Sequence, residues 1–272
     1  MGKRLLEFQG ISLGEPDEDP KVLIDVLAAQ TKAQTSAAAP AIPQLPAYVH
    51  VDDMEEAATA TRIPVGFAKR SIAQVFFDLH ASPYLLVLGN DNSSIDRYLR
   101  GLREAFAQAG DVTYRFVDTQ DLLAPSEPDA NVLVDANEVE AFVTQLNAGE
   151  LSCDVVVFTS VAQTMAALSP TASRTLQDYI TNERGLGKTA FVCASELWRV
   201  RSIYDPWYKV ISAYGNGIWV GSGFVDQTVF HFARALPEYR QPAARSDAFL
   251  TVRGDVTWVR LLEASDEPTD DE

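Results

Sequence analysis

The tripeptide Gly187-Lys188-Thr189 has the residue types that end a phosphate-binding loop. In a P-loop of the form G-x-x-x-x-G-K-[ST], backbone N–H groups and the lysine hold the nucleotide phosphates, and the hydroxyl binds Mg²⁺. The motif requires a glycine five residues before Gly187, where this chain has Asn182. In addition, the apolar run at residues 190–194 predicts a strand directly after the tripeptide, whereas a P-loop leads into a helix. The tripeptide is therefore not predicted to bind a nucleotide.

A second segment has the strand–loop–helix layout that the tripeptide lacks. A continuous apolar run ends in Gly89 and predicts a strand buried on both faces, and a helical pattern begins near Ser94. When the P-loop motif is aligned here, Gly89 takes the first glycine and Ser94 the second. Ile95 then stands at the lysine and Asp96 at the magnesium-binding hydroxyl. We predict a degenerate P-loop at this corner.

Each replacement removes part of the phosphate site. Ile95 carries no charge to offset the phosphates, and Asp96 and Asp91 would place negative charges beside them. The helix N-terminus still offers N–H groups, and Ser93 and Ser94 are expected to cap it. The candidate nucleotide-contacting residues are Gly89, Asn90, Asp91, Asn92, Ser93, Ser94, Ile95 and Asp96.

The acid that P-loop ATPases carry at the end of a neighbouring strand is also missing. The apolar strand predicted at residues 153–160 has the right length and distance, but it ends in Thr159 and Ser160 at the Walker B position. Without the lysine, the magnesium-binding hydroxyl and this acid, no hydrolysis is expected. No cofactor is predicted to be required, and ATP, if it binds, is expected to bind weakly.

The remaining pattern predicts an α/β fold with a mostly parallel sheet and helices on both faces, because strands and helices alternate. Predicted strands span residues 63–68, 73–79, 83–89, 112–118, 153–160, 188–195, 217–222, 248–254 and 256–263, and predicted helices span 93–110, 137–149, 173–185 and 224–236.

Three parts of the chain differ in composition. Residues 1–50 hold a short predicted strand, a helix that begins after Asp19, and prolines at 40, 43 and 46, as expected of the end of one domain and a semi-rigid linker. Residues 51–262 are predicted to form the degenerate ATPase-like domain. Residues 263–272 are rich in acids and lack bases, and they predict a disordered tail.

Composition excludes several classes of function. The net charge of −16, from 38 acidic and 22 basic side chains, disfavours nucleic-acid binding. No apolar window is long enough to cross a membrane, and no signal peptide is recognised. Cys153 and Cys193 lie in apolar runs and are expected to be buried thiols. The three histidines match no metal-ligand spacing, so no metal centre is predicted.

Residues 63–102 resemble the FtsK/SpoIIIE-type ATPase domains of the type VII secretion motors EssC and EccC. The resemblance rests on Ile63-Pro64-Val65-Gly66, on Asp78-Leu79 and on Ser82-Pro83-Tyr84-Leu85-Leu86, which precede the P-loop position. The glycine-flanked strand and helix predicted within residues 215–232, and the N-terminal strand with its linker, are also similar to those domains.

This resemblance implies a RecA-like fold and a place as the last, degenerate domain of a motor. It implies a non-hydrolysing pseudo-ATPase that docks secretion substrates or partners and regulates the upstream ATPase domains of the same chain. It also implies a cytoplasmic location within a membrane-anchored protein, without direct membrane insertion, and hexamer formation in the full motor.

Two other functions stay open on sequence alone. One is a domain that binds ATP weakly through the degenerate loop. The other is an unrecognised small α/β enzyme, for which Asp78, His80 and Ser82 are the tempting residues, although no G-x-S-x-G elbow is present. A dense set of aromatic residues either packs the edge of the core or forms an interface. Its members are Trp198, Tyr204, Trp207, Tyr208, Tyr214 and Trp219.

Overall fold

The computed structural model describes Lys21, Asp25, Val26, Ala29 and residues 44–123, 129–182, 189–201, 203–241, 243–244 and 246–265. The chain divides into two compact units, Met1–Pro43 and Gln44–Glu272. In the first unit the four described residues are helical, in line with the predicted helix. The predicted N-terminal strand, two of the three linker prolines, Gly187 and Lys188 lie outside the described residues.

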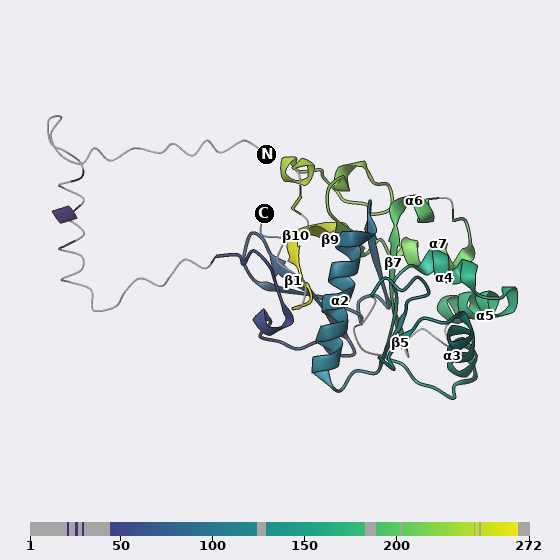
Figure 1. The fold of residues 1–272 in the computed structure, drawn as a ribbon. Helices are drawn as coiled ribbons and strands as arrows, with labels where there is room; N and C mark the ends of the chain where they lie inside the picture. Colours follow the sequence, from purple (N-terminus) through teal and green to yellow (C-terminus); the bar gives the residue numbers. More distant parts are fainter. Residues whose placement is uncertain are drawn as a thin grey trace. The chain divides into compact units, whose positions relative to one another are not determined.

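The second unit is built on a single ten-stranded sheet (Figure 1). Its strands, in spatial order, are β2 (Gln74–Asp78), β1 (Arg62–Ala68), β10 (Asp255–Leu261), β9 (Asp247–Val252), β8 (Gly217–Val220), β3 (Tyr84–Gly89), β7 (Ala190–Glu196), β6 (Val155–Phe158), β4 (Tyr114–Val117) and β5 (Val132–Leu133). Neighbours from β8 to β5 are parallel, and neighbours from β2 to β8 are antiparallel. The three apolar runs that predicted inner strands are β3, β6 and β7. Strands β3 and β6 are buried at every position, and β7 is buried at every position but its last, Glu196.

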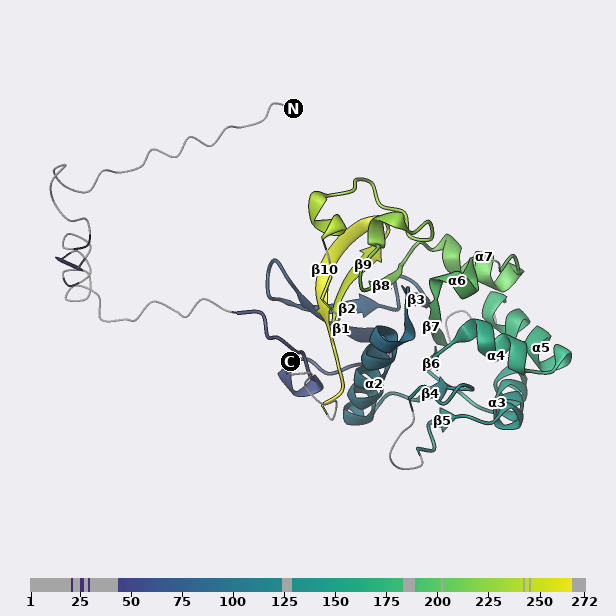
Figure 2. The ribbon, with the colours of Figure 1, turned by 45° about the horizontal axis from the view of Figure 1, so that its top comes forward.

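Helices cover both faces of the sheet, as predicted. Helix α2 (Asn92–Ala109) packs on one face, whereas α3 (Ala136–Ala148), α5 (Pro170–Thr181) and α7 (Pro206–Ala213) pack on the other (Figure 2). Strand β3 alternates between them: Leu85 and Val87 join the core under α2, and Leu86 and Leu88 join the opposite core. This alternation follows from the period of two along a strand.

The pairing of β1 with β10 explains why the motif Ile63-Pro64-Val65-Gly66 ends in a glycine. Gly66 in β1 has a φ of 143°, and a Cβ built on it would lie 1.9 Å from the carbonyl oxygen of Arg260 in β10. A side chain at this position would therefore collide with the backbone of the neighbouring strand. The two predicted strands at 63–68 and 73–79 form a hairpin, the antiparallel β1–β2 ladder.

The helix predicted at residues 224–236 is wrong. The segment contains only the 3-10 turn η2 (Phe224–Asp226), and a second 3-10 turn, η3 (Pro237–Arg240), follows it. The side chain of Gln227 replaces the helical hydrogen bonds: its amide oxygen accepts from the N–H groups of Val229 (2.7 Å) and Phe230 (2.6 Å), and its amide nitrogen donates to the Phe230 carbonyl (2.8 Å). This side chain therefore bends the backbone into a tight loop.

Several short elements were not predicted, because helices of one or two turns and a two-residue strand carry little periodic signal. They are η1 (Val51–Asp53), α4 (Val161–Ala167), α6 (Leu197–Val200), α7 and β5. At the other end of the unit, Glu263 and Ala264 of the predicted tail are buried, and residues 266–272 lie outside the described structure.

The thiol prediction is confirmed, since Cys153 and Cys193 are both buried and unpaired. Burial raises the pKa of the Cys153 thiol to about 11, so this thiol is not activated for chemistry. Among the described residues, no helix combines the length and the apolar character that a membrane span needs. The same residues contain no group of three or more His, Cys, Asp or Glu arranged to hold a metal ion.

Candidate functional site

The degenerate P-loop forms a tight corner between β3 and α2. Strand β3 ends at Gly89 and α2 begins at Asn92, so Asn90 and Asp91 make the whole connection. The Asp91 carboxylate caps the helix: its Oδ1 accepts from the Ser94 backbone N–H at 3.3 Å and from the Ser93 hydroxyl at 2.7 Å. The predicted serine caps are therefore wrong, because α2 begins at Asn92 and Asp91 is its N-cap. A side-chain carboxylate occupies the helix N-terminus, which is where a P-loop holds a phosphate.

The side chain at the lysine position points into the core. Ile95 is fully buried in the α2-side cluster. A Cβ built on Gly89 would lie 3.4 Å from Ile95 Cδ1 and 3.1 Å from the Val220 carbonyl oxygen, so the first turn of α2 packs closely on β3 and β8. Ile95 thus contributes to packing, and it has no group that could bind a phosphate.

Asp96 occupies the magnesium-hydroxyl position and is an unusual carboxylate. Burial raises its pKa from 3.8 to about 7, and Arg100 opposes that rise. The nearby carboxylates Asp118, Asp91 and Glu196 raise it further. Its Oδ1 atom is buried and has no hydrogen-bond partner among the described residues. Asp96 therefore holds a proton at neutral pH far more readily than an exposed aspartate does.

A second acid at this edge, Asp118, was missed by the sequence analysis. It follows β4 directly, is fully buried, and accepts hydrogen bonds from Leu122 N–H (3.0 Å), Leu123 N–H (2.8 Å) and the Thr159 hydroxyl (2.7 Å). Thr159, at the Walker B position, therefore holds the carboxylate of the neighbouring strand. The available signal was the aspartate at the end of the predicted strand 112–118, where parallel strands place ligand-binding residues.

The other residue at the Walker B position, Ser160, belongs to a hydrogen-bond network with Gln163 and Arg199 that the sequence did not reveal. With its amide oxygen toward Arg199, Gln163 accepts hydrogen bonds from the two terminal guanidinium nitrogens at 3.0 and 3.1 Å. Its amide nitrogen donates to Ser160 Oγ at 3.0 Å. Arg199 also pairs with Glu196, at the end of β7, at 2.5 Å. The charge of this arginine is thus offset by Glu196, and its guanidinium lies over the Trp198 ring at 4.2 Å.

Asn90 links the corner to the opposite neighbouring strand. Its amide nitrogen donates to the Ser222 carbonyl at 3.2 Å, and the Trp219 indole N–H donates to the same oxygen at 3.0 Å. Asn92 is half-buried and Ser93 is exposed beside it. The sheet therefore brings all the predicted residues, from Gly89 to Asp96 and at 159–160, to its carboxyl edge.

The candidate hydrolase residues Asp78 and Ser82 make local hydrogen bonds with nearby backbone groups. The Asp78 carboxylate accepts from the His80 backbone N–H at 2.8 Å, and the Ser82 hydroxyl donates to the Tyr84 carbonyl at 2.9 Å. Ser82 is fully buried, whereas His80 is exposed. This geometry gives no support to a nucleophile–base pair.

The aromatic set divides between the two interpretations. Trp207, Tyr208 and Trp219 are buried in the core under α7. Trp198 and Tyr204 are 60% and 77% exposed, and Tyr214 is 39% exposed. Part of the set therefore packs the core, and part of it is accessible to a partner.

No protein-family model and no curated protein matches the sequence. Solved structures do match in fold. They include the cytoplasmic domain of EssC (16% identity, TM-score 0.68, 97% of this chain), EssC ATPases 2 and 3 from Geobacillus thermodenitrificans (15%, 0.69, 92%), and Thermomonospora curvata EccC ATPases 2 and 3 in complex with a signal sequence peptide (15%, 0.62, 89%). The chain spans 58%, 52% and 48% of those three chains. Its fold is that of the P-loop ATPase domains of these secretion motors.

Proposed function

We propose that this chain is a non-hydrolysing, ATPase-like module of a type VII protein secretion motor. The fold shared with EssC and EccC supports the motor assignment. The loss of hydrolysis rests on one observation: the Asp91 carboxylate caps α2 where the phosphate would lie. A nucleotide would have to displace this hydrogen-bonded carboxylate or approach it with a like charge.

The charges along the same edge support this proposal. Asp91, Asp96, Asp118 and Glu196 all come from the corner or from neighbouring strand ends, and they interact electrostatically at Asp96. Arg199 is paired with Glu196, so its charge is already offset. An ATP triphosphate placed here would meet more carboxylates than free cations, which disfavours both binding and transition-state stabilisation.

Docking is the function we propose in place of hydrolysis. In the EccC structure the ATPase pair is in complex with a signal sequence peptide. By analogy, we propose that this module docks a secretion substrate or another secretion component and regulates the ATPase domains that precede it in a membrane-anchored, cytoplasmic-facing motor that assembles as a hexamer. The exposed Trp198 and Tyr204 around α6 are the residues we assign to such contacts.

Phosphate release from Mg²⁺-ATP by the purified 272-residue chain tests the first part. We expect no turnover above the buffer rate, with or without Asp96→Ala. Magnesium-dependent turnover that Asp96→Ala abolishes would overturn the proposal. For docking, fluorescence anisotropy with a labelled secretion-signal peptide should give saturable binding that Trp198→Ala weakens. Tyr214→Ala is the matched control, because Tyr214 is exposed but contacts Tyr84 at a different place.

A further inference from the structure

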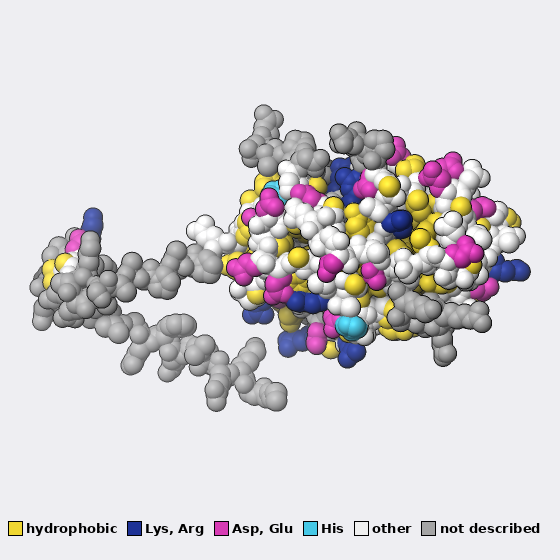
Figure 3. All heavy atoms as spheres, turned by 90° about the horizontal axis from the view of Figure 1, so that it is seen from below, with side chains coloured by type: hydrophobic (Ala, Val, Ile, Leu, Met, Phe, Trp, Pro, Cys, Tyr) yellow, Lys and Arg dark blue, Asp and Glu magenta, His cyan; other side chains and the backbone are white. Residues whose placement is uncertain are grey.

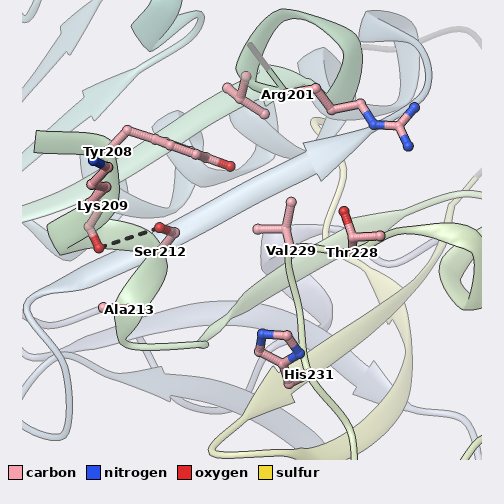
Figure 4. Close-up of a pocket in the computed structure, with 9 residues that line it drawn as sticks. Arg201, Tyr208, Lys209, Ser212, Ala213, Thr228, Val229 and His231 are labelled. Carbon is pink, nitrogen blue, oxygen red and sulfur yellow. Dashed lines mark hydrogen bonds between the residues drawn. The ribbon is translucent and has the colours of Figure 1, made fainter. Parts of the chain in front are cut away.

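A concave pocket lies between α7 and residues 228–231 (Figure 4). Its volume is about 480 Å³, which is in the range of small-molecule sites. None of the predicted P-loop or Walker B residues lines it. The pocket is therefore a feature of the α7 side of the sheet, separate from the degenerate nucleotide corner.

One wall of the pocket is a single face of α7. Tyr208, Lys209, Ser212 and Ala213 line it, and their spacing of three and four residues places them together on the helix. Figure 4 shows the Tyr208 hydroxyl directed toward the segment that carries Val229, whereas the Ser212 hydroxyl donates to the Lys209 carbonyl at 3.4 Å. Burial raises the pKa of the Tyr208 phenol, so this hydroxyl stays protonated at neutral pH and can donate a hydrogen bond.

The opposite wall depends on the buried side chain of Gln227. Its three hydrogen bonds to Val229 and Phe230 hold the backbone in a tight, non-helical bend. Phe230 packs directly over Gly217, where an added Cβ would lie 2.4 Å from the Phe230 ring. Because Gln227 and Phe230 fix the bend from inside, Thr228 and His231 are presented on a preformed surface.

The charge of this pocket differs from that of the chain as a whole. The face of the second unit drawn in Figure 3 shows acidic and basic side chains scattered among apolar and neutral ones, and the chain as a whole has a net charge of −16. The pocket instead has Arg201, Lys209 and His231 among its lining residues. An adjoining pocket of about 370 Å³ shares His231 and adds Arg253. None of the described residues that line the two pockets is acidic.

These basic side chains are not used elsewhere in the described structure. Within residues 44–123, 129–182, 189–201, 203–241, 243–244 and 246–265, no ion pair involves Arg201, Lys209 or Arg253. Unpaired cations gathered in a concavity raise the local concentration of anions. A guanidinium, an ammonium and several hydroxyls together match the oxygens of a phosphate group.

We propose that this pocket binds the phosphate group of a small phosphorylated molecule. Arg201 and Lys209 supply positive charge to the phosphate, and the His231 ring and the Thr228 hydroxyl supply hydrogen bonds. Val229 contacts an apolar part of the ligand. This site does not depend on the lack of ATP hydrolysis, because the nucleotide corner contributes no residue to it.

Isothermal titration calorimetry with phenyl phosphate tests the proposal, because this probe combines a phosphate with an apolar ring. The full chain should bind one equivalent saturably, with an affinity that falls as salt is added. Lys209→Ala and Arg201→Ala should each weaken binding at least about fivefold, the size expected for losing one charged contact. Both side chains are exposed, so the folded state should be retained, and the melting temperature checks this.

Arg174→Ala on α5 is the matched control, since Arg174 is an exposed arginine that does not line the pocket. An equal loss of affinity in Arg174→Ala would overturn the proposal, because binding would then reflect general charge. A second arm uses phosphatidylcholine vesicles with and without phosphatidic acid. Lys209-dependent sedimentation with phosphatidic acid would identify a lipid headgroup as the source of the phosphate. Saturable phenyl phosphate binding without sedimentation identifies a soluble ester, and absence of both refutes the site.

Discussion

The Thr159 hydroxyl lies 2.7 Å from the Asp118 carboxylate and joins the ends of β6 and β4. Both groups are buried. A hydrogen bond to a buried carboxylate is stronger than one between neutral groups, and a carboxylate that loses such a donor keeps its desolvation cost. The Walker B position of this chain is thus occupied by a residue that supports a neighbouring strand end.

Thr159→Val should destabilise the second unit. The substitution keeps the size and the β-branch of the side chain but removes the donor, so we expect a loss of about 1–3 kcal/mol of unfolding free energy. Urea unfolding followed by tryptophan fluorescence measures it. Thr144→Val is the control, because Thr144 is exposed and donates only to the Glu140 carbonyl within α3. A Thr159→Val chain as stable as Thr144→Val would contradict the role we give this bond.

Asp96 should make the free energy of unfolding fall as the pH rises. A salt-bridged acid has the opposite effect, because its pKa is lowered in the folded state. Its folded pKa, about 7, lies above the unfolded value of 3.8. The protonated group therefore contributes stability that is fully present below pH 3.8 and is lost as the pH rises through about 7. Asp96→Asn should therefore raise stability more at pH 8 than at pH 5, by about 1–2 kcal/mol after allowance for partial solvent screening.

The control for this pH profile is Asp135→Asn. The backbone N–H of Asn137 donates to the Asp135 carboxylate and lowers its pKa, so its contribution is present at neutral pH and is lost on acidification. Urea unfolding from pH 2 to pH 8 should therefore separate the two variants: the difference between Asp96→Asn and the parent chain should grow from pH 4 to pH 8, whereas that of Asp135→Asn should change only below pH 4. Parallel slopes would show that Asp96 is not the group with the raised pKa.

The sheet could be predicted from the sequence because its inner strands are continuous apolar runs. The apolar runs of β3 and β6 are too short for a helix, so their length predicts buried strands. The buried face of α2 is predicted by the spacing of Ile95, Leu99 and Phe106, which are all buried. The strand–helix corner after Gly89 was also predictable, because an apolar run ends there and a helical period begins a few residues later.

The partners of these residues could not be predicted, because they depend on which strand ends meet in space. Asp118 and Thr159 are 41 positions apart and become neighbours only through the parallel pairing of β4 with β6. The failed helix at 224–236 has a related cause. Its apolar spacing fits a helix, but the Gln227 side chain accepts hydrogen bonds from backbone N–H groups that a helix would use. Hydrophobic periodicity does not reveal such side-chain to backbone hydrogen bonds.

Gly66→Ala should be among the most damaging single substitutions in the chain. The new methyl group would overlap the Arg260 carbonyl oxygen, and the backbone at a φ of 143° would be strained as well. We expect a loss of about 3 kcal/mol or more, seen as a lowered melting temperature. Gly149→Ala is the matched control: its φ is 74°, no atom lies within 4 Å of the added Cβ, and only the left-handed backbone cost of about 1–2 kcal/mol should remain.

Asp91 is the residue on which the non-hydrolysing interpretation rests, and its role as a helix cap can be separated from its charge. Asp91→Asn keeps an acceptor for the Ser94 N–H but removes the negative charge, whereas Asp91→Ala removes both. We expect Asp91→Ala to cost about 1 kcal/mol of unfolding free energy and Asp91→Asn to cost little, because both carboxylate and amide side chains cap helices well.

The same two variants test whether the carboxylate excludes a phosphate. Titration of the parent chain with a fluorescent ATP analogue should give no saturable signal at millimolar ligand. Asp91→Asn should at most allow weak binding, because Ile95 still replaces the lysine and Asp96 still lies in the first turns of α2. If the parent chain saturates with the analogue and Asp91→Ala does not, then Asp91 supports nucleotide binding at this corner, and the carboxylate cap is not what excludes a phosphate there.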